Sequence, residues 1–361
     1  MIHVVSVLPV VLVGFTQWLV PAIVPPTIPF GVRVPFDRAE APVVLAARRL
    51  YRVVTAVVTV AAAVFALVAP WAGPVAVGAE LLTGLALYLG ARRRIAEAKT
   101  AERWYGGRRQ VTVADTSLRT DPERYPWPWA LPAVLLTAAT VVTGIAAYPH
   151  LPSRLPTHFG LSGRVDRFAA KSVASVFAPV LMQVAATVLL VAVAGAVLHS
   201  RAWLDVEDPA ASVRHRRFVA AVSRVLLVLA GCTSATFLFG ALAAWDVVSP
   251  PAPVRSALGF APGLVGVAVV LLVAVRVGQG GSRLHVTGGG RTGRGARTVN
   301  RDDDALYRWG VFYFNRDDPS VLVPKRFGFG WTLNMARPAT WLIIAAIVGS
   351  LVLGEVVHSL G

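Results

Sequence analysis

The connection formed by residues 148–172 holds the densest group of side chains that could bind a ligand. It reads YPHLPSRLPTHFGLSGRVDRFAAKS, in which three prolines favour a stiff, extended path before the polar residues His158, Asp166, Arg167 and Lys171. Three interpretations are open: His158 and Asp166 ligate a cation, the loop is a receptor surface for a peptide, or it is a structural clasp. In the clasp, Asp166 pairs with Arg167 or Lys171, and His158 hydrogen-bonds to backbone. Two ligands are too few for a closed metal site, so we expect no bound metal and no cofactor.

A second group consists of acidic residues inside or beside apolar runs. Glu80 lies about 10 Å into such a run, at 1.5 Å per residue, and Asp246 and Glu355 lie near the ends of two others. Charged side chains in a bilayer are costly, so each of the three is a candidate ligand-binding residue. One interpretation places them around an outward-facing polar cavity. In the other, Glu80 is protonated or bonded to a neighbouring helix, and the other two contact water at the interface.

No set of residues in the sequence has the spacing of a known catalytic site. It contains no H-E-x-x-H, no G-x-S-x-G and no phosphate-binding loop that ends in G-K-[ST]. The single cysteine, Cys232, leaves no partner for an intrachain disulfide. The sequence therefore predicts a protein without enzymatic activity.

The elements that must position these residues are long apolar runs. Of the 361 residues, 55% are hydrophobic and only 15% are charged, which is too few charges for an ordinary soluble domain. A helix needs about 20 apolar residues to cross the hydrocarbon core of a bilayer. Eight runs meet this length: 3–24, 51–70, 73–91, 128–148, 173–199, 219–246, 257–276 and 339–357. The sequence therefore predicts an all-α integral membrane protein with eight transmembrane helices.

The positions of lysine and arginine predict how these helices are oriented. The connections between the predicted helices alternate along the chain between two sets. One set holds most of the 35 lysine and arginine residues, and the other set holds few of them. The positive-inside rule makes the basic connections cytoplasmic and places the N-terminus, the C-terminus and the 148–172 loop outside. The net charge of +16 is then a feature of membrane topology, so we expect membrane lipids as partners and no nucleic acid. The preference for arginine over lysine is typical of GC-rich bacteria, which indicates a bacterial plasma membrane.

The runs and connections divide the chain into regions of different character. We expect a three-helix region with a basic cytoplasmic extension at 1–127, a two-helix unit with its external loop at 128–200, two further helices at 201–276, a flexible Gly/Arg linker at 277–301, an aromatic cytoplasmic segment at 302–341 and a final helix at 339–361.

The aromatic segment 302–341 is predicted to fold against the membrane surface and to contact a cytoplasmic regulatory protein. VFYF and SVLVP within it favour short strands. The candidate partner-binding residues are Tyr307, Trp309, Phe314 and Trp331. Its acidic residues could bind a cation, but neighbouring arginines and the absence of EF-hand spacing favour a solvated turn. These residues are Asp302, Asp303, Asp304, Asp317 and Asp318.

The 148–172 loop also resembles a known family. The residues that carry the resemblance are Tyr148, Pro149, Leu151, Pro152, Leu155, Pro156, His158, Phe159, Gly163, Asp166, Phe168 and Lys171. Their pattern is similar to a domain of unknown function in bacterial membrane proteins of the SdpI type. That type protein is an immunity factor against a secreted peptide toxin and takes part in signalling. Segment 302–341 resembles a second uncharacterised domain that often accompanies the first.

Together the two resemblances cover less than a fifth of the chain. They imply a receptor, immunity or envelope-sensing protein that binds an extracellular peptide. The alternative is a transporter or flippase-like protein that uses Glu80 and the outward-facing cavity.

Overall fold

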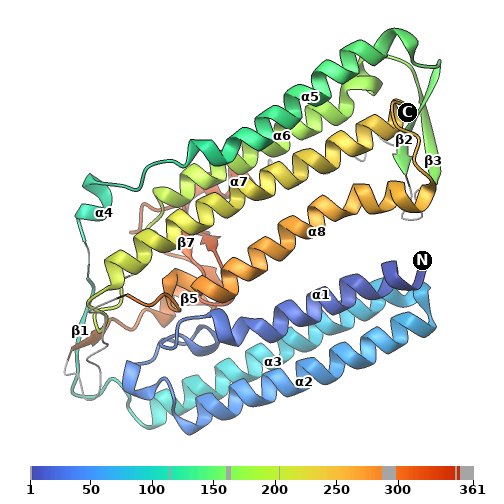
Figure 1. Cartoon of the computed structure of the whole chain (residues 1–361). Coiled ribbons are helices and arrows are strands. Elements are labelled where there is room, and N and C mark those ends of the chain that lie inside the picture. The colour runs from blue at the N-terminus through green and yellow to red at the C-terminus, as the bar shows by residue number, and fades with distance from the viewer. Residues whose placement is uncertain are drawn as a thin grey trace. The chain divides into compact units, whose positions relative to one another are not determined.

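Seven long helices make up most of the computed structural model (Figure 1). The structure describes residues 2–113, 115–159, 164–202, 204–286, 298–345 and 348–349. Within these residues, the helices long and apolar enough to cross a membrane are α1 (Ile2–Ile23), α2 (Pro42–Val68), α3 (Gly73–Ala101), α5 (Leu131–Ala147), α6 (Val173–Leu198), α7 (Ala211–Ala244) and α8 (Ala252–Val277). They confirm seven of the eight predicted spans and indicate a multi-pass membrane protein.

The eighth predicted span, 339–357, is only partly described. Residues 338–345 are helical, while 346–347 and 350–357, including Glu355, lie outside the described residues. The total of eight spans, and the orientation that depends on it, therefore stay predictions.

The structure is mostly helical rather than all-α. Among the described residues, short strands form four two-stranded pairs. Two strands fall on VFYF and SVLVP, as predicted: β6 (Phe312–Tyr313) pairs with β5 (Tyr307–Arg308), and β7 (Leu322–Pro324) pairs with β8 (Trp331–Leu333). The remaining pairs are β1 (Arg109–Val111) with β4 (Thr298–Asn300), and β2 (Arg154–Phe159) with β3 (Val165–Ala170).

The chain folds as two compact units. The first takes its described residues from Met1–Pro122, His199–Val219 and Ala274–Val356, and the second takes its described residues from Glu123–Leu198 and Ala220–Val273. The first unit is therefore discontinuous in sequence, and helices α7 and α8 each contribute to both units.

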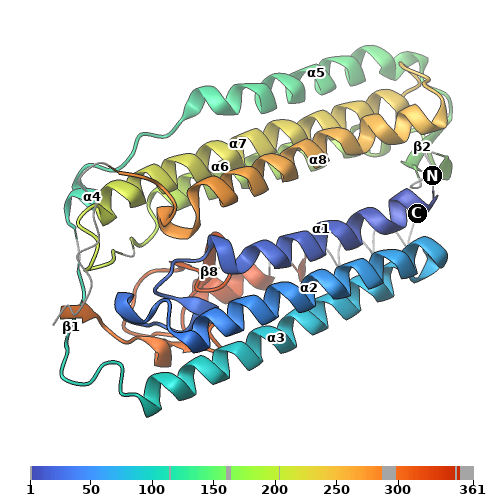
Figure 2. The same cartoon turned by 60° about the horizontal axis from the view of Figure 1, so that its bottom comes forward.

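In the first unit, α1, α2 and α3 pack side by side as a bundle (Figure 2). The turn Pro70–Ala72 joins α2 to α3, at the boundary between the predicted runs 51–70 and 73–91. Helix α3 continues past its apolar run to Ala101, so the first part of the basic connection is helical.

The aromatic segment 302–341 packs against the bundle where α1 ends and α2 begins. The Phe327 ring lies 4.1 Å from that of Tyr88, and Phe30 and Tyr51 complete this buried aromatic group. The segment is thus part of the core of the first unit.

The second unit contains α5, α6, most of α7 and α8, and the β2–β3 hairpin. Small residues allow close helix packing here: a Cβ atom at Gly144 of α5 would lie 2.8 Å from the Trp245 ring. Helices α6 and α7 are joined by polar groups, since Ser223 Oγ donates to Ala194 O at 3.0 Å and Gln183 Nε2 donates to Ser234 O at 3.3 Å. Such bonds replace water inside a bilayer and fix the helix contact.

Candidate functional site

The predicted motif loop is a β-hairpin. Strands β2 and β3 pair antiparallel, with Pro156 opposite Phe168 and His158 opposite Arg167, and the register shifts on both sides of His158. The prolines were expected to extend the path, and the chain is extended there. Gly163 and the rest of 160–163 lie outside the described residues.

The base of the hairpin is fixed to the helices by both apolar and polar contacts. Leu151 and Leu155 are buried in a cluster with Val176 and Trp245. Lys171 Nζ donates to Leu151 O at 3.1 Å and lies 5.0 Å from the centre of the Tyr148 ring. Lys171 thus holds the base of the hairpin through a backbone carbonyl and an aromatic face, which is a different contact from the Asp166 pairing of the clasp interpretation.

The other candidates lie further out on the hairpin. Asp166, Arg167 and Phe168 are exposed, and 54% of the Phe168 surface is accessible. The backbone of His158 is in β2, but its side chain lies outside the described residues. Arg255, at the start of α8, stacks on the Phe159 ring at 5.1 Å. The hairpin therefore presents charged and aromatic side chains on a supported two-stranded element.

A separate polar cluster lies inside the three-helix bundle. It consists of Glu80, Gln17 and Thr59, and we call it the Glu80 cluster. The Glu80 side chain is 3% exposed and lies among Gln17 of α1 and Thr59 of α2. Thr59 interacts with the carboxyl group, but neither carboxyl oxygen has a hydrogen bond of standard geometry to a described residue. Gly84 and Gly14 make room for this cluster, because a Cβ atom at Gly84 would lie 1.7 Å from Gln17 Oε1. Buried carboxyl groups with so few partners are uncommon and costly.

The structure does not test whether Glu80, Asp246 and Glu355 share a cavity. Asp246 is exposed in the turn after α7, in a left-handed conformation with φ 54°, and Ser249 Oγ donates to its carboxylate. Asp246 belongs to the second unit and Glu80 to the first, while Glu355 lies outside the described residues. The shared cavity stays a prediction.

The four aromatic residues predicted to bind a partner have different surroundings. Trp309 is 70% exposed, whereas Tyr307 is 5% exposed and lies under the Arg326 guanidinium at 4.0 Å from the ring centre. Phe314 stacks with Arg308, and the Trp331 ring packs 5.2 Å from Phe218. Trp309 is therefore the member of this group most accessible to a partner.

The expectation that the acidic run forms a solvated turn is wrong for Asp303 and Asp304. Arg33 Nε lies 2.6 Å from Asp303, Lys99 Nζ lies 2.6 Å from Asp304, and Arg326 bonds to both carboxylates. Burial alone would raise the pKa of each aspartate, but the cations outweigh it and lower both pKa values below the ordinary one. We call these five residues the ion network.

The ion network was missed because its cations are distant in sequence. Arg33 and Asp303 are separated by 270 positions, and nothing near Arg326 in the sequence indicates that it contacts Asp303. Asp318 is likewise buried and paired with Arg201. Within the described residues, no group of three or more His, Cys, Asp or Glu side chains could hold a metal ion.

Comparisons with known proteins agree with the two local motifs. Residues 135–182 match a family described as a domain of unknown function (DUF1648), and this match includes α5, the hairpin and the start of α6. Residues 316–341 match a family of unknown function (DUF5808). No curated protein and no solved structure matches the chain. The apolar helices and these two matches together indicate a membrane protein with two segments similar to uncharacterised domains.

Proposed function

We propose that this protein is a receptor, immunity or envelope-sensing factor of the SdpI-like type, in the plasma membrane of a bacterium. In this proposal eight helices cross the membrane, both termini and the hairpin are outside, and the hairpin binds an extracellular peptide. The observation that carries the proposal is the hairpin itself, whose base is clasped by Lys171 while Asp166, Arg167 and Phe168 stay exposed.

A peptide ligand suits the geometry of the hairpin. The described sheet has only two strands, so each strand has one edge that is not bonded to another strand. An extended peptide can add to such an edge through main-chain hydrogen bonds, and side chains beside the edge then select its sequence. Phe168 offers an apolar contact, and Asp166 and Arg167 offer charges of both signs.

The test compares cells that lack the protein after complementation with wild type or with a variant. Growth and transcript levels are measured while the cells are exposed to secreted peptide fractions from other bacteria. We expect Asp166→Ala/Phe168→Ala, and separately His158→Ala, to abolish the response without lowering the amount of protein in the membrane. The control is Val247→Ala/Val248→Ala, which changes two exposed residues in the turn after α7. A full response with the hairpin variants would reject the hairpin as the binding site.

The orientation has its own test in a Cys232→Ala background. A membrane-impermeant maleimide added to intact cells should modify Arg164→Cys and spare Arg316→Cys. Labelling of Arg316→Cys alone would reject the proposed orientation.

The Glu80 cluster favours a second candidate function, that of a transporter. A nearly unbonded carboxyl group inside a helix bundle is a place where a proton or a cation can be taken up. In proteoliposomes, Glu80→Gln should then abolish pH-driven or cation-driven solute uptake, while Asp121→Asn, at an exposed site outside the bundle, should not. Wild-type protein that moves no cation, proton or solute would remove this candidate.

A further inference from the structure

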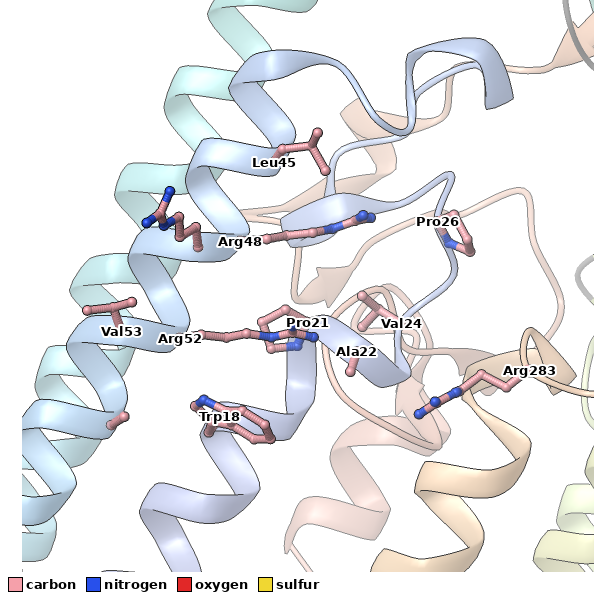
Figure 3. Close-up of a pocket in the computed structure, with 12 residues that line it drawn as sticks. Trp18, Pro21, Ala22, Val24, Pro26, Leu45, Arg48, Arg52, Val53 and Arg283 are labelled. Atoms are coloured by element: carbon pink, nitrogen blue, oxygen red, sulfur yellow. The ribbon is translucent and has the colours of Figure 1, made fainter.

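Four arginines line one open groove at the end of the bundle where α1 stops and α2 begins. The groove has a volume of about 750 Å³, within the range of about 300–1,000 Å³ that is usual for ligand sites. Arg48, Arg49 and Arg52 come from α2, and Arg283 comes from the segment after α8 (Figure 3). Figure 3 shows Arg48 and Arg52 extending from α2 towards the end of α1, with Arg283 reaching in from the other side.

Within the part of the chain that the structure describes, no acidic side chain neutralises the charges of this arginine groove. No ion pair joins any of the four arginines to a described residue. Glu40 attracts Arg48 from beyond ion-pair distance. The Nε atoms of Arg48 and Arg52 are buried and have no hydrogen-bond partner among the described residues. Buried guanidinium donors without acceptors are costly, so the groove is suited to an anion that supplies several oxygens.

The position of the groove along the helices points to the source of this anion. After Arg52, α2 continues from Val53 to Val68 without a charged residue, so Arg48 and Arg52 mark its change from polar to apolar surroundings. Trp18 of α1 lies beside Arg52, whose guanidinium is 5.5 Å from its ring centre, and tryptophan favours the headgroup layer. Three of the apolar residues that line the groove, Leu45, Val53 and Ala56, are exposed on α2. Guanidinium groups at headgroup level above exposed apolar side chains match a phosphate attached to acyl chains.

We propose that the arginine groove is a binding site for an anionic phospholipid, with its phosphate between Arg48, Arg52 and Arg283 and its acyl chains along Trp18 and Val53. Four cations can neutralise more than one phosphate, so the groove prefers a lipid of the cardiolipin class, with two phosphates, over phosphatidylglycerol, with one. This proposal depends on neither the peptide-binding hairpin nor the Glu80 cluster.

The experiment measures binding of cardiolipin, phosphatidylglycerol, phosphatidylcholine and inorganic phosphate to the full-length protein in detergent, by thermophoresis. We expect cardiolipin to bind most tightly and phosphatidylcholine to bind weakly. Arg48→Gln/Arg52→Gln should weaken cardiolipin binding about 30-fold, equivalent to about 2 kcal/mol at 1.4 kcal/mol per tenfold change. The matched control Arg94→Gln/Arg316→Gln removes the same charge from exposed sites outside the groove and should stay within about twofold of wild type.

A further variant covers the case in which the double variant does not fold. Arg283 is exposed and lies outside the bundle helices, so Arg283→Gln should leave the fold intact and weaken cardiolipin binding about fivefold. Equal cardiolipin binding by wild type and by the groove variants would overturn the proposal. If inorganic phosphate alone binds the groove and displaces cardiolipin at cellular concentrations, the proposal that a lipid occupies the groove is overturned.

Discussion

Replacing Arg326 with glutamine should destabilise the first unit more than any exposed arginine substitution. Arg326 is 1% exposed, donates to Gly31 O at 3.1 Å and bonds to the carboxylates of Asp303 and Asp304. Its guanidinium also covers the Tyr307 ring at 4.0 Å. The substitution leaves two partly buried carboxylates with one cation fewer.

The expected loss of folding free energy depends on the cations that each carboxylate keeps after the substitution. Removing one partner of a buried ion pair costs about 3–5 kcal/mol. Asp303 keeps Arg33 and Asp304 keeps Lys99, each at 2.6 Å, and the two aspartate side chains are 24% and 20% exposed to screening water. The loss should therefore lie at the lower end, about 3 kcal/mol. For a unit of this size that lowers the midpoint of thermal unfolding by about 6–12 °C.

Thermal unfolding of the purified protein in detergent, followed by intrinsic fluorescence, measures this shift. Arg316→Gln is the matched control, because Arg316 is exposed in the same segment, and its midpoint should move by less than about 2 °C. A double-mutant cycle with Asp303→Asn should show a coupling free energy of about 1–3 kcal/mol. An Arg326→Gln midpoint within 2 °C of wild type would refute the reasoning that the ion network holds the aromatic segment to the bundle.

Three further predictions concern the same two units. Because the folded-state pKa values of Asp303 and Asp304 are lowered, the stability they contribute is present above the ordinary aspartate pKa of about 3.9 and is lost as pH falls below it; the difference in unfolding midpoint between wild type and Asp303→Asn/Asp304→Asn should therefore be constant from about pH 5 to 8 and shrink below about pH 4. Lys171→Met should raise the amide hydrogen-exchange rates in the hairpin about tenfold, because one charged hydrogen bond of about 1.5 kcal/mol is lost. Unchanged exchange rates, measured by mass spectrometry, would count against a role of Lys171 in holding the hairpin. Gly310→Ala should destabilise the first unit by about 1–2 kcal/mol or more in the same unfolding assay, because φ is 73° there and the new Cβ atom would lie 2.4 Å from the Tyr88 hydroxyl.

Features set by local sequence were predictable. Hydropathy located seven helices, in one case almost to the residue: the predicted span 173–199 is α6, Val173–Leu198. The turn at Pro70–Ala72 followed from the short gap between two apolar runs. The strands at VFYF and SVLVP followed from β-branched and aromatic residues. Each depends on the composition of neighbouring residues, which a single sequence shows directly.

Features set by distant pairing were not predictable. The hairpin prolines indicated extension but not which residues pair. Neighbouring arginines and the absence of EF-hand spacing favoured a solvated turn for Asp303, whose partners Arg33 and Arg326 are distant in sequence. In the sequence, Arg48 and Arg52 indicate only the orientation of the helices, since nothing local shows that Arg283 shares a groove with them. For the candidate site, the sequence located the exposed charges of the hairpin, whereas the Lys171 to Leu151 bond required the structure.

The ion network also imposes an order on biosynthesis. Arg33 is made 270 residues before Asp303, and bacterial and eukaryotic ribosomes add about 5–20 residues per second, so an interval of about 15–55 s separates the two. During this interval the nascent first three helices are in place without Asp303, Asp304 or Arg326. A chain that stops before residue 303 keeps Arg33 without these carboxylates, so the ion contacts that hold the aromatic segment to the bundle form only late in synthesis.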